Sequence, residues 1–102
     1  MNEKSTDDIP DGIVCVSDIM ALAAFNSFSI KGLKVPGDVM LSGLDDGLIA
    51  GIAPIALTTV NPRLDVMAEK IIDMVRRISD GETFTGNYYI DYALVRRDST
   101  KR

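Results

Sequence analysis

The chain contains no histidine and only one cysteine among its 102 residues. Without histidine, serine–histidine triads, cysteine–histidine dyads and the usual zinc sites are excluded. A single cysteine cannot form an internal disulfide, as expected of a protein in a reducing cytoplasm. Because Cys15 lies in the strand-like run Ile13-Val-Cys-Val16, we expect a buried, unreactive thiol. We therefore predict no cofactor and no enzymatic activity.

Long apolar runs and an excess of positive charge are also lacking. No segment reaches the roughly 18 apolar residues needed to cross a bilayer, so no membrane partner is expected. The polar residues 1–10 show no secretory signal and are expected to form a disordered or extended leader. A net charge of −4 argues against nucleic-acid binding by this chain's own surface. The late bases are expected to form a solvated end rather than a phosphate clamp: Arg96, Arg97, Lys101 and Arg102.

What the chain does contain is an alternation of strand-like and helix-like segments. Strands are expected over residues 12–16, 39–43, 57–60 and 87–96, and helices over residues 19–31 and 62–80. Asp18 and Asn61 are suitable N-cap residues for the two helices. This order predicts an α/β fold with a mainly parallel sheet flanked by helices. So few strands would leave sheet edges uncovered, which indicates part of a larger protein.

Two segments are more apolar than a small monomer requires. The helix over residues 19–31 carries apolar side chains on more than one face, whereas a surface helix normally has one apolar stripe. The connection over residues 48–57 has no charged residue, although most loops are polar. Both segments indicate a surface covered by a partner. For the connection, the alternative is a buried turn that folds inward.

Two adjacent acids follow the strand over residues 39–43, in the sequence Ser42-Gly-Leu-Asp-Asp46. Open α/β sheets bind ligands just beyond the carboxyl ends of their strands. Asp45 is therefore a candidate ligand contact, because a carboxylate accepts several hydrogen bonds. Asp46 is expected to cap the turn. A phospho-acceptor site is a weaker alternative, because Lys70 lies on the polar face of a helix instead of at a strand end.

Five pieces of the chain stand in a particular order: Pro10-Asp-Gly-Ile-Val-Cys-Val-Ser-Asp-Ile-Met-Ala-Leu22, Gly32-Leu-Lys-Val-Pro-Gly-Asp-Val39, Ser42-Gly-Leu-Asp-Asp46, Pro54-Ile-Ala-Leu-Thr-Thr-Val60 and Leu94-Val-Arg-Arg-Asp-Ser-Thr100. In this order and spacing they resemble the C-terminal part of the effector-binding core of LacI/GalR-type transcription regulators. The resemblance implies that residues 11–102 are a C-terminal lobe fragment of a periplasmic-binding-protein-like (type I) fold. That fragment would carry the effector-binding and dimerisation functions.

The resemblance also implies a function and a site. In such repressors a small effector, commonly a sugar or a nucleobase, binds between two lobes and changes the affinity for operator DNA. This chain would reach DNA only through a helix-turn-helix domain, which its own sequence does not contain. The candidate effector-binding residues would be Asp45, Ser17 and Asp18, although Asp18 is expected to act mainly as a helix cap. The family usually has an aromatic residue where Leu44 stands, so the effector's identity stays open.

The resemblance further implies a homodimer formed through the two apolar segments. Helical spacing then places six side chains at a two-fold interface: Met20, Ala24, Phe28, Ile49, Ile52 and Ile55. The competing hypothesis is a fragment of a periplasmic sugar-binding protein. Such proteins usually work as monomers, and they would need no apolar interface of this kind.

Overall fold

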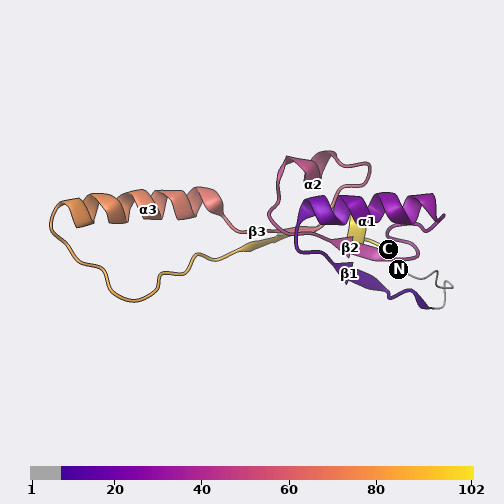
Figure 1. Cartoon of the computed structure of the whole chain (residues 1–102), viewed down its shortest axis with the longest axis horizontal. Coiled ribbons are helices and arrows are strands. Elements are labelled where there is room, and N and C mark those ends of the chain that lie inside the picture. Colours follow the sequence, from indigo (N-terminus) through magenta and orange to yellow (C-terminus); the bar gives the residue numbers. More distant parts are fainter. Residues whose placement is uncertain (1–7) are drawn as a thin grey trace.

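A computed structural model describes residues 8–102, so most of the expected leader, residues 1–7, lies outside the described part. The elements along the described chain are β1 (Gly12–Val14), α1 (Asp18–Ile30), β2 (Met40–Ser42), α2 (Leu48–Ile52), β3 (Thr59–Asn61), α3 (Leu64–Ser79), β4 (Ala93–Val95) and the 3-10 helix η2 (Asp98–Thr100). Figure 1 shows two regions along this chain. We call residues 8–61 and 93–102 the core, and residues 62–92 the arm.

The strands form a parallel part and an antiparallel part. Strand β1 pairs with β2 in parallel, with Ile13 opposite Leu41, and a parallel bridge between Ser42 and Thr58 extends this arrangement. The mainly parallel α/β fold expected from the sequence is thus confirmed. Strand β4, however, runs antiparallel to β3, with Leu94 opposite Val60. The reason is visible in Figure 1: the chain leaves the core along β3, follows α3 outward, and returns along β4.

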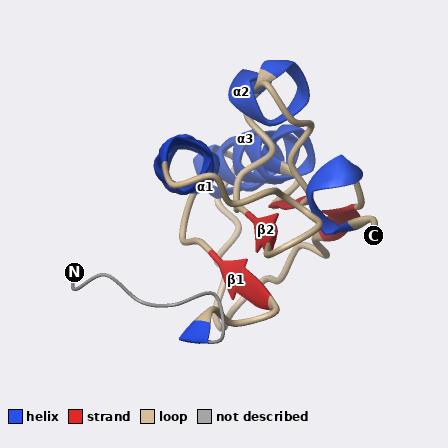
Figure 2. Ribbon diagram, turned by 90° about the vertical axis from the view of Figure 1, so that its right-hand side faces the viewer, coloured by secondary structure: helices blue, strands red, loops and turns tan. Residues whose placement is uncertain are grey.

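The packed interior lies between the parallel strands and two helices. Figures 1 and 2 show α1 and α2 on the same side of β1 and β2. The buried cluster consists of Cys15, Ala21, Leu41, Ala50 and Leu57. Complete burial of a leucine side chain contributes about 1.5–3 kcal/mol, so Leu41 and Leu57 dominate this small interior. Cys15 is only 5% exposed, which confirms the buried environment expected for it, and this burial raises the pKa of its thiol.

Helix α1 starts with a different cap from the one expected. The hydroxyl oxygen of Ser17 accepts a hydrogen bond from the backbone N–H of Met20 at 3.1 Å, so Ser17 is the N-cap. Asp18 is the first helical residue, and its carboxylate is turned inward, away from the free N–H groups of the first turn. The sequence-based choice of Asp18 as the cap was therefore wrong by one residue. Serine and aspartate are equally good N-cap residues. The choice of Ser17 follows from the hydrogen bonds that the Asp18 carboxylate accepts from Thr59 and Gly47.

The apolar connection over residues 48–57 is more ordered than expected. It begins with the short helix α2, which buries Ala50 completely, while Ile55 packs against the buried cluster. Leu48 and Ile52 of the same helix point outward and are exposed. The inward-folding alternative is thus correct for one side of this segment, and the other side remains an exposed apolar surface.

The arm extends far from the core. The chain measures 62 × 25 × 20 Å and has a radius of gyration of 18.7 Å. A compact domain of this length would have a radius of about 13 Å. Helix α3 buries none of its residues, although its sequence has a clear apolar stripe. No helix within residues 8–102 is both long and apolar enough to span a membrane.

The last strand is shorter than the sequence indicates. Only Ala93–Val95 pairs with β3, whereas a strand was expected over residues 87–96. Strand β3 ends at Asn61, so the residues before Ala93 have no strand beside them. Tyr88 instead packs edge-on against Phe84, and the ammonium group of Lys70 lies 5.1 Å from the centre of its ring.

The C-terminal residues reach the core only in part: Ser99 is buried and Arg97 is half-buried, whereas Arg96, Lys101 and Arg102 are exposed, as expected of a solvated end. Ser99 is fully buried; its hydroxyl donates to the carbonyl of Leu41 at 2.6 Å and accepts from the N–H of Thr58 at 2.8 Å. Arg102 donates to the carbonyl of Pro36 at 3.0 Å. The contacts of Ser99 satisfy backbone groups of Leu41 in β2 and of Thr58, which is why this polar residue after β4 packs inward.

Candidate functional site

A hollow of about 280 Å³ lies between the start of α1 and the start of α2. It is lined by the residues that follow β1 and β2: Ser17, Asp18, Ile19, Leu44, Asp45, Gly47, Leu48 and Ile49. The structure thus brings together all three residues predicted from the sequence to bind an effector, Ser17, Asp18 and Asp45. Their position beyond the carboxyl ends of parallel strands is where open α/β sheets bind ligands.

Asp18 forms the inner wall of this hollow and is only 4% exposed. One carboxylate oxygen accepts from the hydroxyl of Thr59 at 2.7 Å, and the other accepts from the N–H of Gly47 at 2.9 Å. A Cβ atom on Gly43 would collide with this carboxylate, so the position requires glycine. Both oxygens are engaged within the protein, which gives Asp18 a structural role. Contact between Asp18 and a ligand stays a prediction.

Asp45 differs from Asp18 in every respect that matters for binding. Its side chain is exposed, and its carboxylate forms no hydrogen bond or ion pair with any of residues 8–102. Its backbone is held in an unusual conformation, with φ at 108°, while its N–H donates to the carbonyl of Val60 at 2.9 Å. Asp45 therefore presents an unengaged anionic acceptor at the rim of the hollow.

Ser17 supplies the complementary group. Its hydroxyl oxygen accepts from Met20, but its own hydrogen is still available for donation. Leu44 and Leu48 add apolar walls beside the two polar groups. One donor, one charged acceptor and an apolar wall suit a small ligand with several hydroxyl groups. The described residues contain no grouping of side chains that could hold a metal ion.

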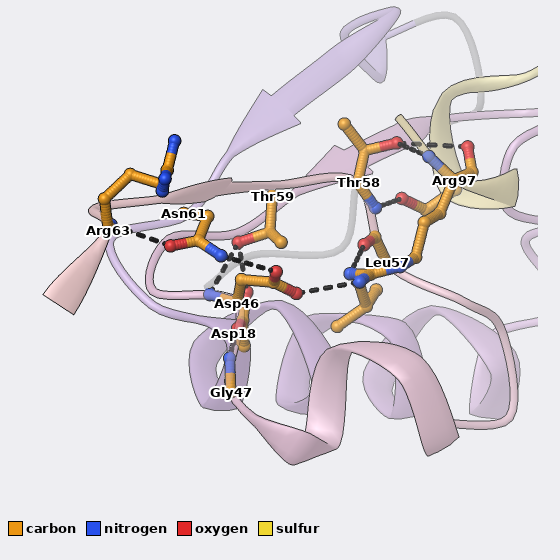
Figure 3. A network of polar contacts seen from close by, with 10 residues as sticks. Asp18, Asp46, Gly47, Leu57, Thr58, Thr59, Asn61, Arg63 and Arg97 are labelled. Carbon is orange, nitrogen blue, oxygen red and sulfur yellow. Dashed lines mark hydrogen bonds and ion pairs between the residues drawn. The ribbon is translucent and has the colours of Figure 1, made fainter. Parts of the chain in front are cut away.

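Asp46 is engaged as fully as Asp18, but its carboxylate binds residues distant in the sequence instead of capping the turn, as was expected. One of its oxygens pairs with the guanidinium of Arg97 at 2.8 Å, and the other accepts from the side-chain amide of Asn61 at 3.1 Å (Figure 3). Asn61, expected as the cap of α3, also accepts from the N–H of Arg63 at 2.7 Å, and Arg63 occupies the cap position. The reasoning from sequence missed Arg97. The two partners are 51 positions apart, and nothing in the local pattern links them.

A second, larger hollow lies elsewhere. It measures about 630 Å³ and lies in the arm, between α3 and the returning chain, where its lining residues are Met67, Lys70, Ile71, Met74, Gly86, Asn87, Tyr88, Tyr89 and Ile90. None of the predicted site residues contributes to it. Its wall includes part of the apolar stripe of α3, a helix that buries none of its residues within the described chain. We therefore attribute this hollow to the uncovered face of the arm, and assign the ligand site to the smaller hollow.

The sequence matches the family of the periplasmic binding protein-like domain over residues 1–100. The chain belongs to this family. It is 31% identical over 90 residues to the HTH-type transcriptional regulator RegA of Clostridium saccharobutylicum, a match that covers 87% of this chain and 27% of RegA. The solved lac repressor dimer bound to operator and the anti-inducer ONPF superposes with a TM-score of 0.83 at 27% identity, covering 90% of this chain and 28% of that one.

A third relative is the transcriptional regulator CelR, solved as a complex with cellobiose. Its TM-score is 0.79 at 31% identity, with 87% of this chain and 28% of that chain covered. The resemblance to LacI/GalR-type regulators is thus confirmed. These relatives carry the names of regulators and not of enzymes. The chain spans less than a third of the length of each of them.

Proposed function

We propose that this chain is the effector-binding and dimerisation part of a LacI-type transcriptional repressor. Asp45 and Ser17 contact a small sugar-like or nucleobase effector, and operator DNA is bound by a helix-turn-helix domain elsewhere in the complete regulator. The observation that carries the proposal is the contrast among three neighbouring acids. The carboxylates of Asp18 and Asp46 accept hydrogen bonds from other groups of the protein. The carboxylate of Asp45 accepts none and lies at the rim of the hollow.

The chemistry of the hollow favours a sugar. A carboxylate accepts two hydrogen bonds from neighbouring hydroxyl groups, and a serine hydroxyl donates to a third. The CelR relative was solved with cellobiose, a disaccharide of this chemistry. Since the effector of such a regulator lies between two lobes, this chain supplies half of the contacts. We therefore expect weak binding by the chain alone.

The test is a titration of the chain with cellobiose, followed by amide chemical shifts, which detect weak binding. We expect the shifts to change at Ser17, Asp45 and Gly47. Asp45→Asn keeps the shape of the side chain but removes its charge, and should weaken binding about tenfold, since hydrogen bonds to a charged group contribute about 1.5–3 kcal/mol. Asp91→Asn removes an exposed charge in the arm and is the matched control. Equal affinities of the Asp45 and Asp91 variants would contradict the proposal.

Dimerisation is proposed through the exposed side of α1 and α2. Of the six side chains predicted at the interface, Met20 and Ile52 are exposed. The other four, Ala24, Phe28, Ile49 and Ile55, are half-buried, and Ala24, Phe28 and Ile55 pack against the buried cluster. Ile19 and Leu48 are exposed on the same two helices and join the proposed surface. We call Ile19, Met20, Leu48 and Ile52 the helical patch. The lac repressor relative, solved as a dimer, supports this proposal.

A further inference from the structure

Arg97 stands at the end of β4, next to the point where the chain re-enters the core. Its guanidinium donates to the Asp46 carboxylate at 2.8 Å and to the carbonyl of Leu57 at 3.0 Å. The side chains of Arg97 and Asp46 are 24% and 16% exposed, so this ion pair is largely shielded from water. A shielded, hydrogen-bonded pair is worth more than the ion pairs of a protein surface.

Asp46 is held from two strands at once. Arg97 holds one carboxylate oxygen from the β4 side, and Asn61, the last residue of β3, holds the other. The N–H of Asp46 donates to the hydroxyl of Thr59, which in turn donates to Asp18. Figure 3 shows these groups as one connected network between β3, β4 and the loop that follows β2. We call residues 44–47 of this loop the effector loop.

The effector loop needs this support because its backbone is strained. Asp45 and Asp46 have φ values of 108° and 51°, a region that residues with a Cβ atom adopt rarely. Such conformations cost about 1–3 kcal/mol and persist only where the surrounding structure fixes them. The side chain of Asp45 makes no contact that could fix it. The backbone bond from Asp45 to Val60 and the hydrogen bonds of Asp46 therefore act together to constrain the direction in which Asp45 points.

We propose that Arg97 is a positioning residue of the effector site, acting through Asp46 to hold the Asp45 carboxylate at the rim of the hollow. Arg97 does not line the hollow itself. The proposal rests on the proposed function of Asp45. It adds that the affinity for the effector depends on an ion pair with the far end of the chain.

The test combines amide hydrogen exchange with a cellobiose titration of the 102-residue chain. Arg97→Met keeps the apolar stem but removes the guanidinium. We expect the N–H groups of Asp45 and Asp46 to exchange about tenfold faster, and cellobiose to bind about tenfold more weakly, because hydrogen bonds to charged groups are lost. The N–H of Cys15, bonded to the carbonyl of Ser42, reports on the core and should change much less.

Three further variants separate positioning from folding. Asp46→Asn keeps the shape of the side chain but removes the ion pair, and should accelerate exchange in the effector loop in the same way. Arg97→Lys restores a positive charge without the two-pronged geometry and should recover part of the loss. Arg96→Met alters the exposed neighbouring arginine and should leave exchange and binding unchanged.

Two results would overturn the proposal. One is equal acceleration of exchange at Cys15 and in the effector loop of Arg97→Met, which would mean general destabilisation. The other is faster loop exchange with unchanged affinity for cellobiose, which would mean that loop order does not matter for binding. Failure of the proposed function looks different: Asp45→Asn would bind cellobiose as the wild type does. The exchange data would then still decide whether Arg97 holds the loop.

Discussion

The core and the arm both contain helices rich in apolar residues, but only the core buries apolar side chains in a packed cluster. Helix α1 in the core is apolar on several faces, and it packs Ala21, Ala24 and Phe25 against the strands. Helix α3 in the arm has the cleaner stripe, yet side chains in the middle of that stripe, such as Ile71 and Val75, are 54% and 60% exposed. An apolar stripe indicates which face of a helix favours contact with other apolar groups. It does not indicate whether the same part of the chain supplies those groups.

The arm keeps its form mainly through local contacts. Arg77 pairs with Glu82 at 2.8 Å and stacks over the ring of Phe84 at 5.0 Å, and the hydrogen bond that its guanidinium donates to Glu82 raises the pKa of that guanidinium. Exposed pairs of this kind contribute little to stability. An isolated helix of this length is marginal in water.

The largest effect is expected from removing buried volume in the core. Leu57→Ala should lower the free energy of unfolding by about 2–5 kcal/mol, because Leu57 is fully buried and its loss leaves a cavity. Val75→Ala on the arm should cost less than about 1 kcal/mol, because its side chain already faces water. Urea unfolding followed by circular dichroism measures both. If the Val75 variant cost as much as the Leu57 variant, the arm would be covered in solution.

An intermediate effect is expected on self-association. It is tested by placing a charge either on the helical patch or on the arm and comparing how strongly each variant dimerises. Ile52→Glu should raise the dissociation constant of the dimer about tenfold or more, as is typical of a central interface residue. Ile71→Glu introduces the same charge on α3 and should leave the dimer intact. Sedimentation at several concentrations measures both variants. The reverse pattern would place the interface on the arm, and a wild-type chain that stayed monomeric would favour the sugar-binding alternative.

The smallest effect is a pH dependence confined to the core. Burial raises the pKa of the Cys15 thiol above its ordinary value of 9.0. Above that pH the unfolded chain ionises the thiol while the folded chain keeps it protonated, so stability should fall as the pH rises further. The difference between wild type and Cys15→Ala isolates this contribution. Ile71→Cys in the Cys15→Ala background carries an exposed thiol and should show no such fall. A fall of equal size would mean that burial does not set the pKa of Cys15.

The positions of the elements and of the effector loop were predictable, because they depend on local patterns. Alternating apolar segments placed the first three strands and both long helices within a few residues. The rule that ligands lie beyond the carboxyl ends of strands led to Asp45. It was less predictable which residue caps α1 and which acids form hydrogen bonds within the protein. Ser17 and Asp18 are chemically equivalent as caps, and only the hydrogen bond from Thr59 to Asp18 decides between them.

Other features could not be predicted because they join distant parts of the chain. The pairing of Arg97 with Asp46 and the burial of Ser99 beside Leu41 depend on where the last strand returns. The last strand was expected to be long because its residues alternate well. It is short because its partner β3 ends at Asn61. The length of a strand depends on the strand that pairs with it, and this pairing cannot be read from the sequence of one strand alone.

The amino-acid sequence by itself determined the family, the order of helices and strands, and the acid that faces the hollow, since each of these is written in short stretches of neighbouring residues. The tertiary structure decided which acids are engaged within the protein, that Arg97 and Ser99 join the core, and that α3 extends away from it. Those outcomes depend on contacts between residues far apart in the chain, whose energies arise only when the chain has folded.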